Sequence, residues 1–448
     1  MTNPVALAAG MPGTVSARVT EVRGRFVVLV KVDPQTRRGA LDADAGAALA
    51  TAANVALDAR LPLVGVVASS GADVHDGVAA LHGWGTAARA FARCSGIVPI
   101  LLAVTGPTLS GPALLLGMAD VVVMTEAASA YLVGPGAVAS FTGEQVTPAD
   151  LGGAQVHDRQ TGVAAVVTDD EESALDALSA VLGHLPDHCD AEPPCWPTSD
   201  SVERRTPEAG ALLPPTAAGS YDVREVARAL ADESQLVELW AGWAPNLVTA
   251  LVTVGGRPAG IVANQPLALA GSIDISASQK GARFVGLCDA FNVPLVTLVD
   301  TSGFFPGKDR EWRGMIRHGA QLVGAYARAT VPRVCVVLRK AYGGAYIVMD
   351  SKTMGSDVCL AWPSAEMAVM GARQAAQILH RREGPEGRAA REAEYATTLL
   401  NPWTAAERGY VDAVIDPADT RRAVAAALEL LRSKREELPQ RAHDNLPL

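Results

Sequence analysis

Four apolar stretches rich in β-branched residues stand out along the chain, and each contains or ends on glycine. They read LPLVGVVASSG (61–71), VPILLAVTG (98–106), VPLVTLVDTSG (293–303) and VPRVCVVLRKAYGG (331–344). Short runs of this composition, bounded by turn residues, are typical of buried strands. Segments with helical spacing lie within 84–96 and 317–330, so strand, helix and strand follow one another twice.

The two strand-helix-strand segments indicate an internal duplication. The stretch from Pro62 to Gly111 and the stretch from Pro294 to Gly344 differ in length by a single residue. Both contain a Val-Pro step before the second strand. Strands joined by helical crossovers run parallel, so the sequence predicts an α/β protein in which one unit is built twice.

A proline-rich polar segment separates the two halves. Residues 187–221 show neither helical nor strand periodicity, as expected of a linker. We therefore predict an N-terminal domain at 1–195, a linker at 196–221 and a C-terminal domain at 222–448.

Composition and charge restrict the class of protein. The chain has 448 residues, of which 49% are hydrophobic and 19% charged, so it is long enough for more than one globular domain. A net charge of −10 argues against general binding to nucleic acid or an anionic membrane, although a local basic patch can still hold an anionic ligand. No signal peptide or membrane-spanning stretch is visible, so a cytoplasmic protein is expected.

The six cysteines and eight histidines are dispersed along the chain. No cysteine pair has the two-residue gap of a zinc knuckle or a redox motif, and no HExxH sequence is present. We expect neither a metal site nor a disulfide framework.

The turn at RKAYGGAY (339–346) has no acid, histidine or nucleophile of its own. Glycine allows close approach to the backbone, so adjacent N–H groups can point at an oxygen that becomes negative. A similar turn, LSGPALLLGMAD (109–120), follows the corresponding strand of the first copy. Free N–H groups at two helix starts suit two anions, or two carbonyl oxygens that become anionic. The plain alternative is an ordinary strand-to-helix turn.

Dense motifs fill the region from Asn264 to Met370. They include KGARFVGLCDAFNVPLVTLVDTSGFFPG (280–307), RHGAQLVGAYARATVPRVCVVLRKAYGGAYIVMDSK (317–352) and AWPSAEMAVMGA (361–372), and the chain closes on HDNLPL (443–448). This text resembles the carboxyltransferase (β) subunits of biotin-dependent acyl-CoA carboxylases, in the crotonase-like superfamily. The first half is similar more loosely, through LGGAQVHDRQTGVA (151–164), VGPGAV (133–138) and VTGPTLSG (104–111). The resemblance implies two duplicated crotonase-like domains of the ββα superhelix type.

Such enzymes move CO2 from N1 of carboxybiotin to the α-carbon of an acyl-CoA thioester. The biotin ureido oxygen and the thioester oxygen each become negative, and each needs an oxyanion hole. The resemblance assigns Gly344 and Ala345 to one hole and the N–H groups of Ser110 and Gly111 to the other, and it leaves open which hole serves which oxygen. The released biotin anion can take the α-proton, which explains the lack of a side-chain base.

The resemblance also implies residues that bind substrate. Gly343, Tyr346 and Ile347 belong to the acyl site, where an apolar residue at 347 favours acetyl-CoA and still admits propionyl-CoA. Lys280 and Arg283 are candidates for contacts with coenzyme A phosphates, and a solvated helix face is the alternative.

Other polar and aromatic residues have both functional and structural interpretations. Asp300, Glu366 and Asp274 are candidate acids or bases, with caps and turns as the alternative. His318 and Trp362 are expected to be structural.

The first half departs from the sequence motifs that are common in this family. SSGAD (69–73) stands where SGGAR is common, and Ser110-Gly111-Pro112 stands where paired glycines are common. A glycine-rich motif is missing around QTRRGALDAD (36–45), and in the second half Ser302 replaces a usual proline. These changes put coenzyme A binding by the first half in question.

We therefore expect a carboxyltransferase subunit that makes malonyl- or methylmalonyl-CoA from acetyl- or propionyl-CoA. The chain has neither an MKM-like biotinylation site nor a Walker-type ATP loop, so biotin must be carried and carboxylated by partners: a biotin carboxylase and a biotin carboxyl carrier subunit. The resemblance implies a homo-oligomer, most simply a hexamer. The alternatives are a decarboxylase of malonyl-type thioesters and a non-catalytic subunit with a degenerate N-terminal half.

Overall fold

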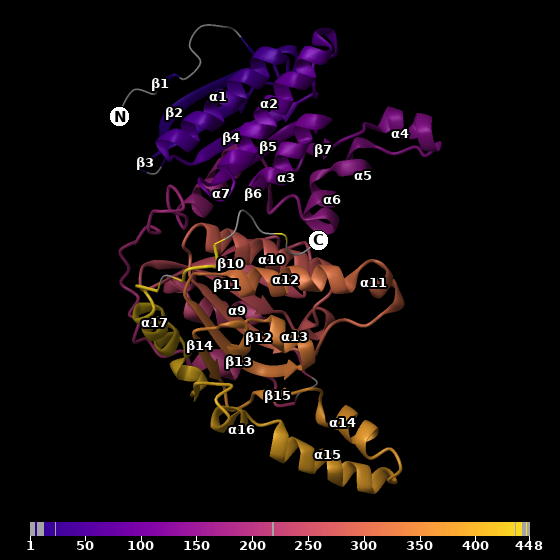
Figure 1. The fold of residues 1–448 in the computed structure, drawn as a ribbon, viewed down its shortest axis with the longest axis vertical. Helices are drawn as coiled ribbons and strands as arrows, with labels where there is room; N and C mark the ends of the chain where they lie inside the picture. Colours follow the sequence, from indigo (N-terminus) through magenta and orange to yellow (C-terminus); the bar gives the residue numbers. More distant parts are fainter. Residues whose placement is uncertain are drawn as a thin grey trace. The chain divides into compact units, whose positions relative to one another are not determined.

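The computed structural model describes residues 5–6, 13–22, 24–216, 219–434, 436–440 and 445. The chain divides into two compact units (Figure 1). Unit 1 takes the described part of 1–194 together with 240–243 and 290–292, and unit 2 takes the described part of 195–239, 244–289 and 293–448. The closing HDNLPL lies outside the described residues except for Asn445.

Unit 1 is built on a sheet whose strands run in the order β1-β2-β3-β4-β5-β6-β8, with β7 paired to the far end of β5. The first three strands are antiparallel, and all further pairings are parallel. The strands are β1 (Val5–Ala6), β2 (Val15–Val22), β3 (Arg25–Val32), β4 (Leu63–Ser69), β5 (Ile100–Leu109), β6 (Val121–Thr125), β7 (Ser129–Tyr131) and β8 (Val166–Thr168).

Helices α1 and α2 lie side by side in unit 1 (Figure 1). Their close approach depends on small residues, because a Cβ on Gly46 would lie 2.2 Å from the carbonyl carbon of Gly83. The side chain of Asp42 caps the start of α1 by accepting from the N–H of Ala45 at 2.8 Å. The helices are α1 (Ala43–Ala59), α2 (Val78–Cys94), α3 (Leu114–Met118), α4 (Pro135–Thr142), α5 (Pro148–Gly152), α6 (Ala154–Val156) and α7 (Glu171–Leu182).

Unit 2 repeats this sheet in the order β9-β10-β11-β12-β13-β14-β16, with β15 paired to the far end of β13. Here too the first three strands are antiparallel and the rest parallel. The strands are β9 (Val237–Leu239), β10 (Leu247–Val254), β11 (Arg257–Asn264), β12 (Leu295–Thr301), β13 (Arg333–Tyr342), β14 (Val358–Ala361), β15 (Glu366–Ala368) and β16 (Ala413–Val414).

The helices of unit 2 cover this sheet and add a hairpin, α14 with α15, that extends away from it (Figure 1). The strands they cover are almost entirely buried, as in β12, where every residue is buried. The helices are α8 (Pro207–Ala211), α9 (Val223–Leu230), α10 (Ile275–Ala290), α11 (Lys308–Trp312), α12 (Met315–Arg328), α13 (Gly343–Val348), α14 (Ala372–Leu379), α15 (Pro385–Leu399), α16 (Pro402–Glu407) and α17 (Thr420–Leu430).

The duplication predicted from the sequence is confirmed down to backbone detail. The β4/β5 register shifts between Val67 and Ser69, and the β12/β13 register shifts between Val299 and Thr301. Before α1 and α10 the chain makes the same left-handed turn, in which a Cβ on Gly39 or Gly271 would lie 2.1 or 2.2 Å from a backbone carbonyl oxygen. The two units are thus copies of one α/β architecture.

The segment expected to be a linker packs against unit 2. It contains α8, whose Ala209 is part of the unit 2 core, and the N–H of Thr206 donates to the carbonyl of Ala418 at 2.7 Å. Proline-rich composition therefore accompanies ordered packing here. The division into domains at 195 and 222 stays a prediction.

Candidate active site

The turn that joins β13 to α13 in unit 2 presents free backbone donors. Gly343 has a φ of +61°, in the left-handed region that favours glycine. The N–H groups of Gly343, Gly344 and Ala345 start α13 and so have no acceptor within the helix. The side chains at this turn are small, so a ligand oxygen can come close to these N–H groups.

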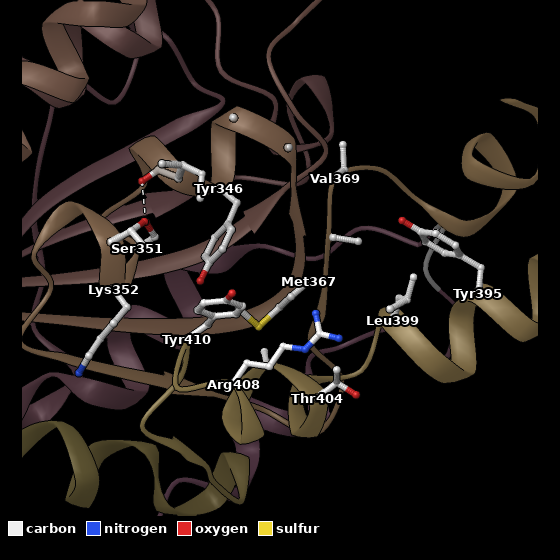
Figure 2. A pocket seen from close by; sticks show the side chains of 16 residues that line it. Tyr346, Ser351, Lys352, Met367, Val369, Tyr395, Leu399, Thr404, Arg408 and Tyr410 are labelled. Atoms are coloured by element: carbon white, nitrogen blue, oxygen red, sulfur yellow. Dashed lines mark hydrogen bonds between the residues drawn. The ribbon is translucent and has the colours of Figure 1, made fainter. Parts of the chain in front are cut away.

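A pocket of about 640 Å³ opens beside this turn, within unit 2 (Figure 2). Its lining is mostly apolar, and the guanidinium of Arg408 extends into it from below in this view. The lining residues come from α13, β15, α15, α16 and their loops: Gly343, Gly344, Tyr346, Ile347, Ser351, Lys352, Thr353, Met367, Ala368, Val369, Tyr395, Leu399, Thr404, Ala405, Arg408 and Tyr410.

The tyrosines around the turn are neutral donors. Burial, together with the neighbouring thiols of Cys359 and Cys335, raises the pKa of Tyr346. Burial also raises the pKa of Tyr342, whose hydroxyl donates to the carboxylate of Glu366. Neither hydroxyl is set up to lose its proton, so at this turn polar contacts are supplied as hydrogen bonds.

The candidate acids of the sequence make structural contacts. Asp300 is buried and accepts from Arg339 at 2.9 Å and from the N–H of Lys340 at 3.2 Å. Burial raises the pKa of Asp300, while the positive charge of Arg339 opposes that rise. Asp274 caps α10 by accepting from the N–H of Ala277 at 2.9 Å. These contacts match the capping and turn roles that the sequence left open.

Lys280 is buried in the interior of unit 2. Its side chain is fully covered, and the ammonium donates to the carbonyl of Ala244 at 3.4 Å. The phosphate contact expected at Lys280 stays a prediction. Arg283 follows on the same helix and is half-buried.

Trp362 and His318, which the sequence led us to expect in structural roles, contact other side chains of unit 2. Trp362 is buried, and its indole N–H donates to the hydroxyl of Thr420 at 2.9 Å. His318 lies 3.2 Å from the side-chain amide of Gln279, on the facing helix α10.

The corresponding turn of unit 1 joins β5 to a short 3₁₀ helix, Gly111–Ala113. Ser110 occupies φ +62° and ψ −151°, a region that side-chain-bearing residues rarely adopt. Its N–H donates to the carbonyl of Tyr131 at 3.0 Å. The oxyanion-hole role expected for this N–H stays a prediction. Gly111 is packed under Trp84, whose ring leaves no room for a Cβ.

The unusual residues of QTRRGALDAD and SSGAD compensate each other. Asp73 is buried and pairs with Arg37, and it also accepts from the N–H of His75 at 2.8 Å. The carboxylate of Asp73 is therefore neutralised by Arg37, which belongs to the other unusual segment. The sequence shows that both segments are unusual, but it does not show that these two residues form an ion pair.

Sequence reasoning also missed the far wall of the pocket. Tyr395 and Leu399 on α15, with Arg408 and Tyr410 after α16, face the turn of α13 (Figure 2). They lie 50 to 65 residues beyond Ala345 and form no motif with the turn. Only the return of the chain after β15 brings them together.

Among the residues that the structure describes, no group of three or more His, Cys, Asp or Glu side chains is arranged to hold a metal ion. In the same part of the chain, no helix has the length and apolar character needed to cross a membrane.

Two copies of one α/β unit, each with a glycine-bearing turn after the equivalent strand, are the architecture of a duplicated crotonase-like enzyme. Residues 6–446 match the carboxyl transferase domain, and the chain belongs to this family. The resemblance inferred from the sequence is thus confirmed, and the protein is a carboxyltransferase.

Three relatives illustrate the family. The chain is 42% identical to the propionyl-CoA carboxylase beta chain of Saccharopolyspora erythraea, over 95% of this chain and 82% of that protein. It is 38% identical to the methylmalonyl-CoA decarboxylase subunit alpha of Veillonella parvula, over 95% of this chain and 84% of that protein. The hexameric transcarboxylase 12S, solved with methylmalonyl-CoA bound, matches with a TM-score of 0.95 at 39% identity, over 97% of this chain and 85% of that one.

Proposed function

We propose that this protein is the carboxyltransferase subunit of a biotin-dependent acyl-CoA carboxylase. It moves a carboxyl group from carboxybiotin, carried by a partner, to the α-carbon of acetyl-CoA or propionyl-CoA, giving malonyl- or methylmalonyl-CoA. The observation that carries the proposal is the turn at 343–345, where free backbone donors stand at the edge of an apolar pocket in a chain of this family.

Gly344 and Ala345 stabilise one developing oxyanion through their N–H groups, and removal of such a donor typically costs about 3 to 4 kcal/mol of transition-state stabilisation. Gly343 gives the turn its left-handed shape. Tyr346 and Ile347 border the space in which the reacting group is held. On the unit 1 side, the N–H of Gly111 serves the second oxygen, and Arg283 is a candidate for coenzyme A.

The donor set of the turn fits biotin. The ureido ring of biotin is uncharged and flat, and its oxygen accepts hydrogen bonds, which suits small side chains, free N–H groups and an apolar wall. Biotin supplies the transferable carboxyl group and a base for the α-proton, so the turn needs no ionisable side chain of its own.

Partners and location follow from the same proposal. A biotin carboxylase and a biotin carboxyl carrier must load biotin, and the protein works with them in the cytoplasm. A hexamer is proposed because transcarboxylase 12S, at 39% identity, is described as a hexamer assembly.

A second candidate function is decarboxylation of a malonyl-type thioester. It is favoured by the similarity to a methylmalonyl-CoA decarboxylase subunit over 95% of this chain. The same oxyanions form in both directions, so the same residues are involved.

The test is a carboxylation assay with a purified biotinylated partner on acetyl-, propionyl- and butyryl-CoA, run beside decarboxylation of malonyl- and methylmalonyl-CoA. We expect ATP-dependent carboxylation of acetyl-CoA and propionyl-CoA. Release of CO2 without any net carboxylation would favour the decarboxylase. Absence of turnover in both directions would favour a non-catalytic subunit.

A further inference from the structure

Sheet register fixes which residues of the two turns correspond. In unit 1 the last residue of β5, Leu109, pairs with Tyr131 of β7. In unit 2 the last residue of β13, Tyr342, pairs with Ala368 of β15. The residues that follow are therefore equivalent in order: Ser110 with Gly343, Gly111 with Gly344, Pro112 with Ala345 and Leu114 with Ile347.

Backbone shape and burial support the same correspondence. Ser110 has a φ of +62° and Gly343 a φ of +61°. Pro112 and Ala345 are both buried, and two residues later Leu114 and Ile347 are 48% and 39% exposed. The unit 1 turn thus has the geometry of the unit 2 turn, although a serine in a glycine-type conformation is strained.

The two turns differ in the number of hydrogen-bond donors they offer. In unit 2 the N–H groups of Gly344 and Ala345 are both free of helix acceptors. In unit 1 the position equivalent to Ala345 is Pro112, which has no N–H. The flanking N–H groups are used, because that of Ser110 donates to Tyr131 and that of Ala113 donates to the carbonyl of Ser110 at 2.9 Å.

We propose that Pro112 leaves the unit 1 turn with a single backbone donor, the N–H of Gly111, and thereby limits the rate of the reaction. This inference rests on the proposed function, in which each turn serves one oxyanion. An oxygen held at unit 1 receives one hydrogen bond from the turn, whereas an oxygen held at unit 2 receives two. The step that builds charge at unit 1 is then the slow one.

The fold can accept the residue that restores the donor. The ring of Pro112 reaches a small space in the core of unit 1 beside Leu41, Phe91 and Leu115. Ala345 fills the matching place in unit 2 and is fully buried. Pro112→Ala therefore adds an N–H where the other copy already has one, and removes only part of a side chain.

The experiment compares wild type with Pro112→Ala in the complete complex, and measures kcat and KM for carboxylation of acetyl-CoA and for the reverse decarboxylation of malonyl-CoA. We expect kcat to rise at least about tenfold in both directions, since one oxyanion-hole donor is worth about 10² to 10³ in kcat. KM should change by less than kcat, because the added bond strengthens in the transition state.

Pro207→Ala is the matched control. Pro207 is an exposed proline at the start of α8 and belongs to neither turn, so the same chemical change should leave kcat unaltered. An unchanged kcat in folded Pro112→Ala would overturn the proposal.

An infrared measurement separates this inference from the proposed function. Acetyl-CoA with a ¹³C thioester carbonyl and biotin with a ¹³C ureido carbonyl are bound in turn to wild type and to Pro112→Ala. A lower stretching frequency of one of these carbonyls in the variant reports the added hydrogen bond, whatever the net reaction proves to be. Identical frequencies for both ligands would show that no oxygen sits at this turn and would overturn the inference even if carboxylation is observed.

Discussion

At the scale of single residues, the proposed function depends on peptide N–H groups, so we expect the substitutions with the largest effect on turnover to be those that change the backbone. Gly343 sets the direction of the turn, and Gly344 and Ala345 supply N–H groups. A substitution of Ala345 that keeps the backbone N–H should lower turnover only slightly. A substitution that removes the N–H should lower turnover strongly.

Ala345→Pro is the direct test of this statement. Turnover should fall by roughly 10² to 10³, because one donor to the oxyanion is lost, while substrate affinity changes less. The variant should fold, because proline is tolerated in the first turn of a helix and Pro112 already occupies the matching place in unit 1. Steady-state kinetics check this, with Ala345→Gly as the control that keeps the N–H. Full turnover in folded Ala345→Pro would mean that the turn connects β13 to α13 and has no catalytic role.

Ile347→Asp should shift preference from acetyl-CoA toward propionyl-CoA. Ile347 lines the pocket and is 39% exposed, so a carboxylate there stays hydrated and the fold is kept. One methylene is worth about 1 to 3 kcal/mol in such discrimination, so the selectivity of wild type should be modest. Ratios of kcat/KM for the two thioesters measure the shift, with Ile347→Val as the conservative control. Equal ratios in wild type and Ile347→Asp would leave Ile347 as a packing residue.

At the scale of elements, the strands were readable from the sequence because a parallel strand covered on both faces leaves an apolar run bounded by turn residues. The runs at 61–71 and 293–303 contain β4 and β12, and their copies follow at the expected spacing. The turn at 343–345 could be predicted for the same reason, since it directly follows such a run. The sequence pattern was sufficient to predict those features that depend on residues close together in the chain.

The remaining features of the site depend on contacts distant in sequence. Nothing near Lys280 indicates that it is buried against the carbonyl of Ala244. Nothing near Ser110 shows that its N–H is used by Tyr131. The wall formed by α15 and α16 appears only when the chain returns past β15. Such pairings are set by tertiary packing, which periodicity does not encode.

Helix α13 is held in place by a buried ion pair behind it. Asp350, just beyond its end, accepts from Arg333 of β13 at 2.7 Å, and Arg333 also donates to the carbonyl of Gly355 at 2.7 Å. Asp350→Ala leaves a buried guanidinium without its carboxylate and should lower the free energy of unfolding by about 3 to 5 kcal/mol. Denaturant unfolding measures the loss. The half-exposed pair of Lys352 with Asp412 is the control, since Lys352→Ala should cost no more than about 1 kcal/mol.

The same carboxyl predicts a pH dependence of stability. Burial raises the pKa of Asp350 from 3.8 to about 6, against the opposing charge of Arg333. The folded protein therefore takes up this proton before the unfolded chain does. The resulting stabilisation is fully present below pH 3.8 and is lost as the pH rises through about 6. The difference in unfolding free energy between wild type and Asp350→Asn should accordingly grow from pH 7 to pH 5, and a constant difference would refute this assignment.

At the scale of the whole molecule, the exposed apolar surface of unit 2 bears on how copies of the chain assemble. Exposed apolar residues lie on the α14 hairpin and just before it, among them Val369 at 74%, Ile378 at 60% and Leu379 at 66% exposure. Surfaces of this kind are usually covered by another protein chain. The exposed apolar residues and the similarity to a hexameric relative both favour an oligomer.

Light scattering after gel filtration should therefore show an assembly larger than a monomer, with a hexamer as the expected state. Leu379→Glu should weaken the assembly, because a charge in an apolar contact is costly to desolvate. Glu386→Gln, at the exposed start of α15, is the control that alters charge without adding one to an apolar contact. A monomer with full activity would be incompatible with the proposed assembly.

Because of the duplication, the two units of one chain can be compared residue by residue, as two related proteins would be. Where both copies keep a residue, as at Gly39 and Gly271, a shared backbone constraint is sufficient to explain it. Where they differ inside an unchanged backbone, as at Pro112 and Ala345, geometry no longer accounts for the choice. Comparison within one molecule thus separates what the architecture demands from what each half was selected to do.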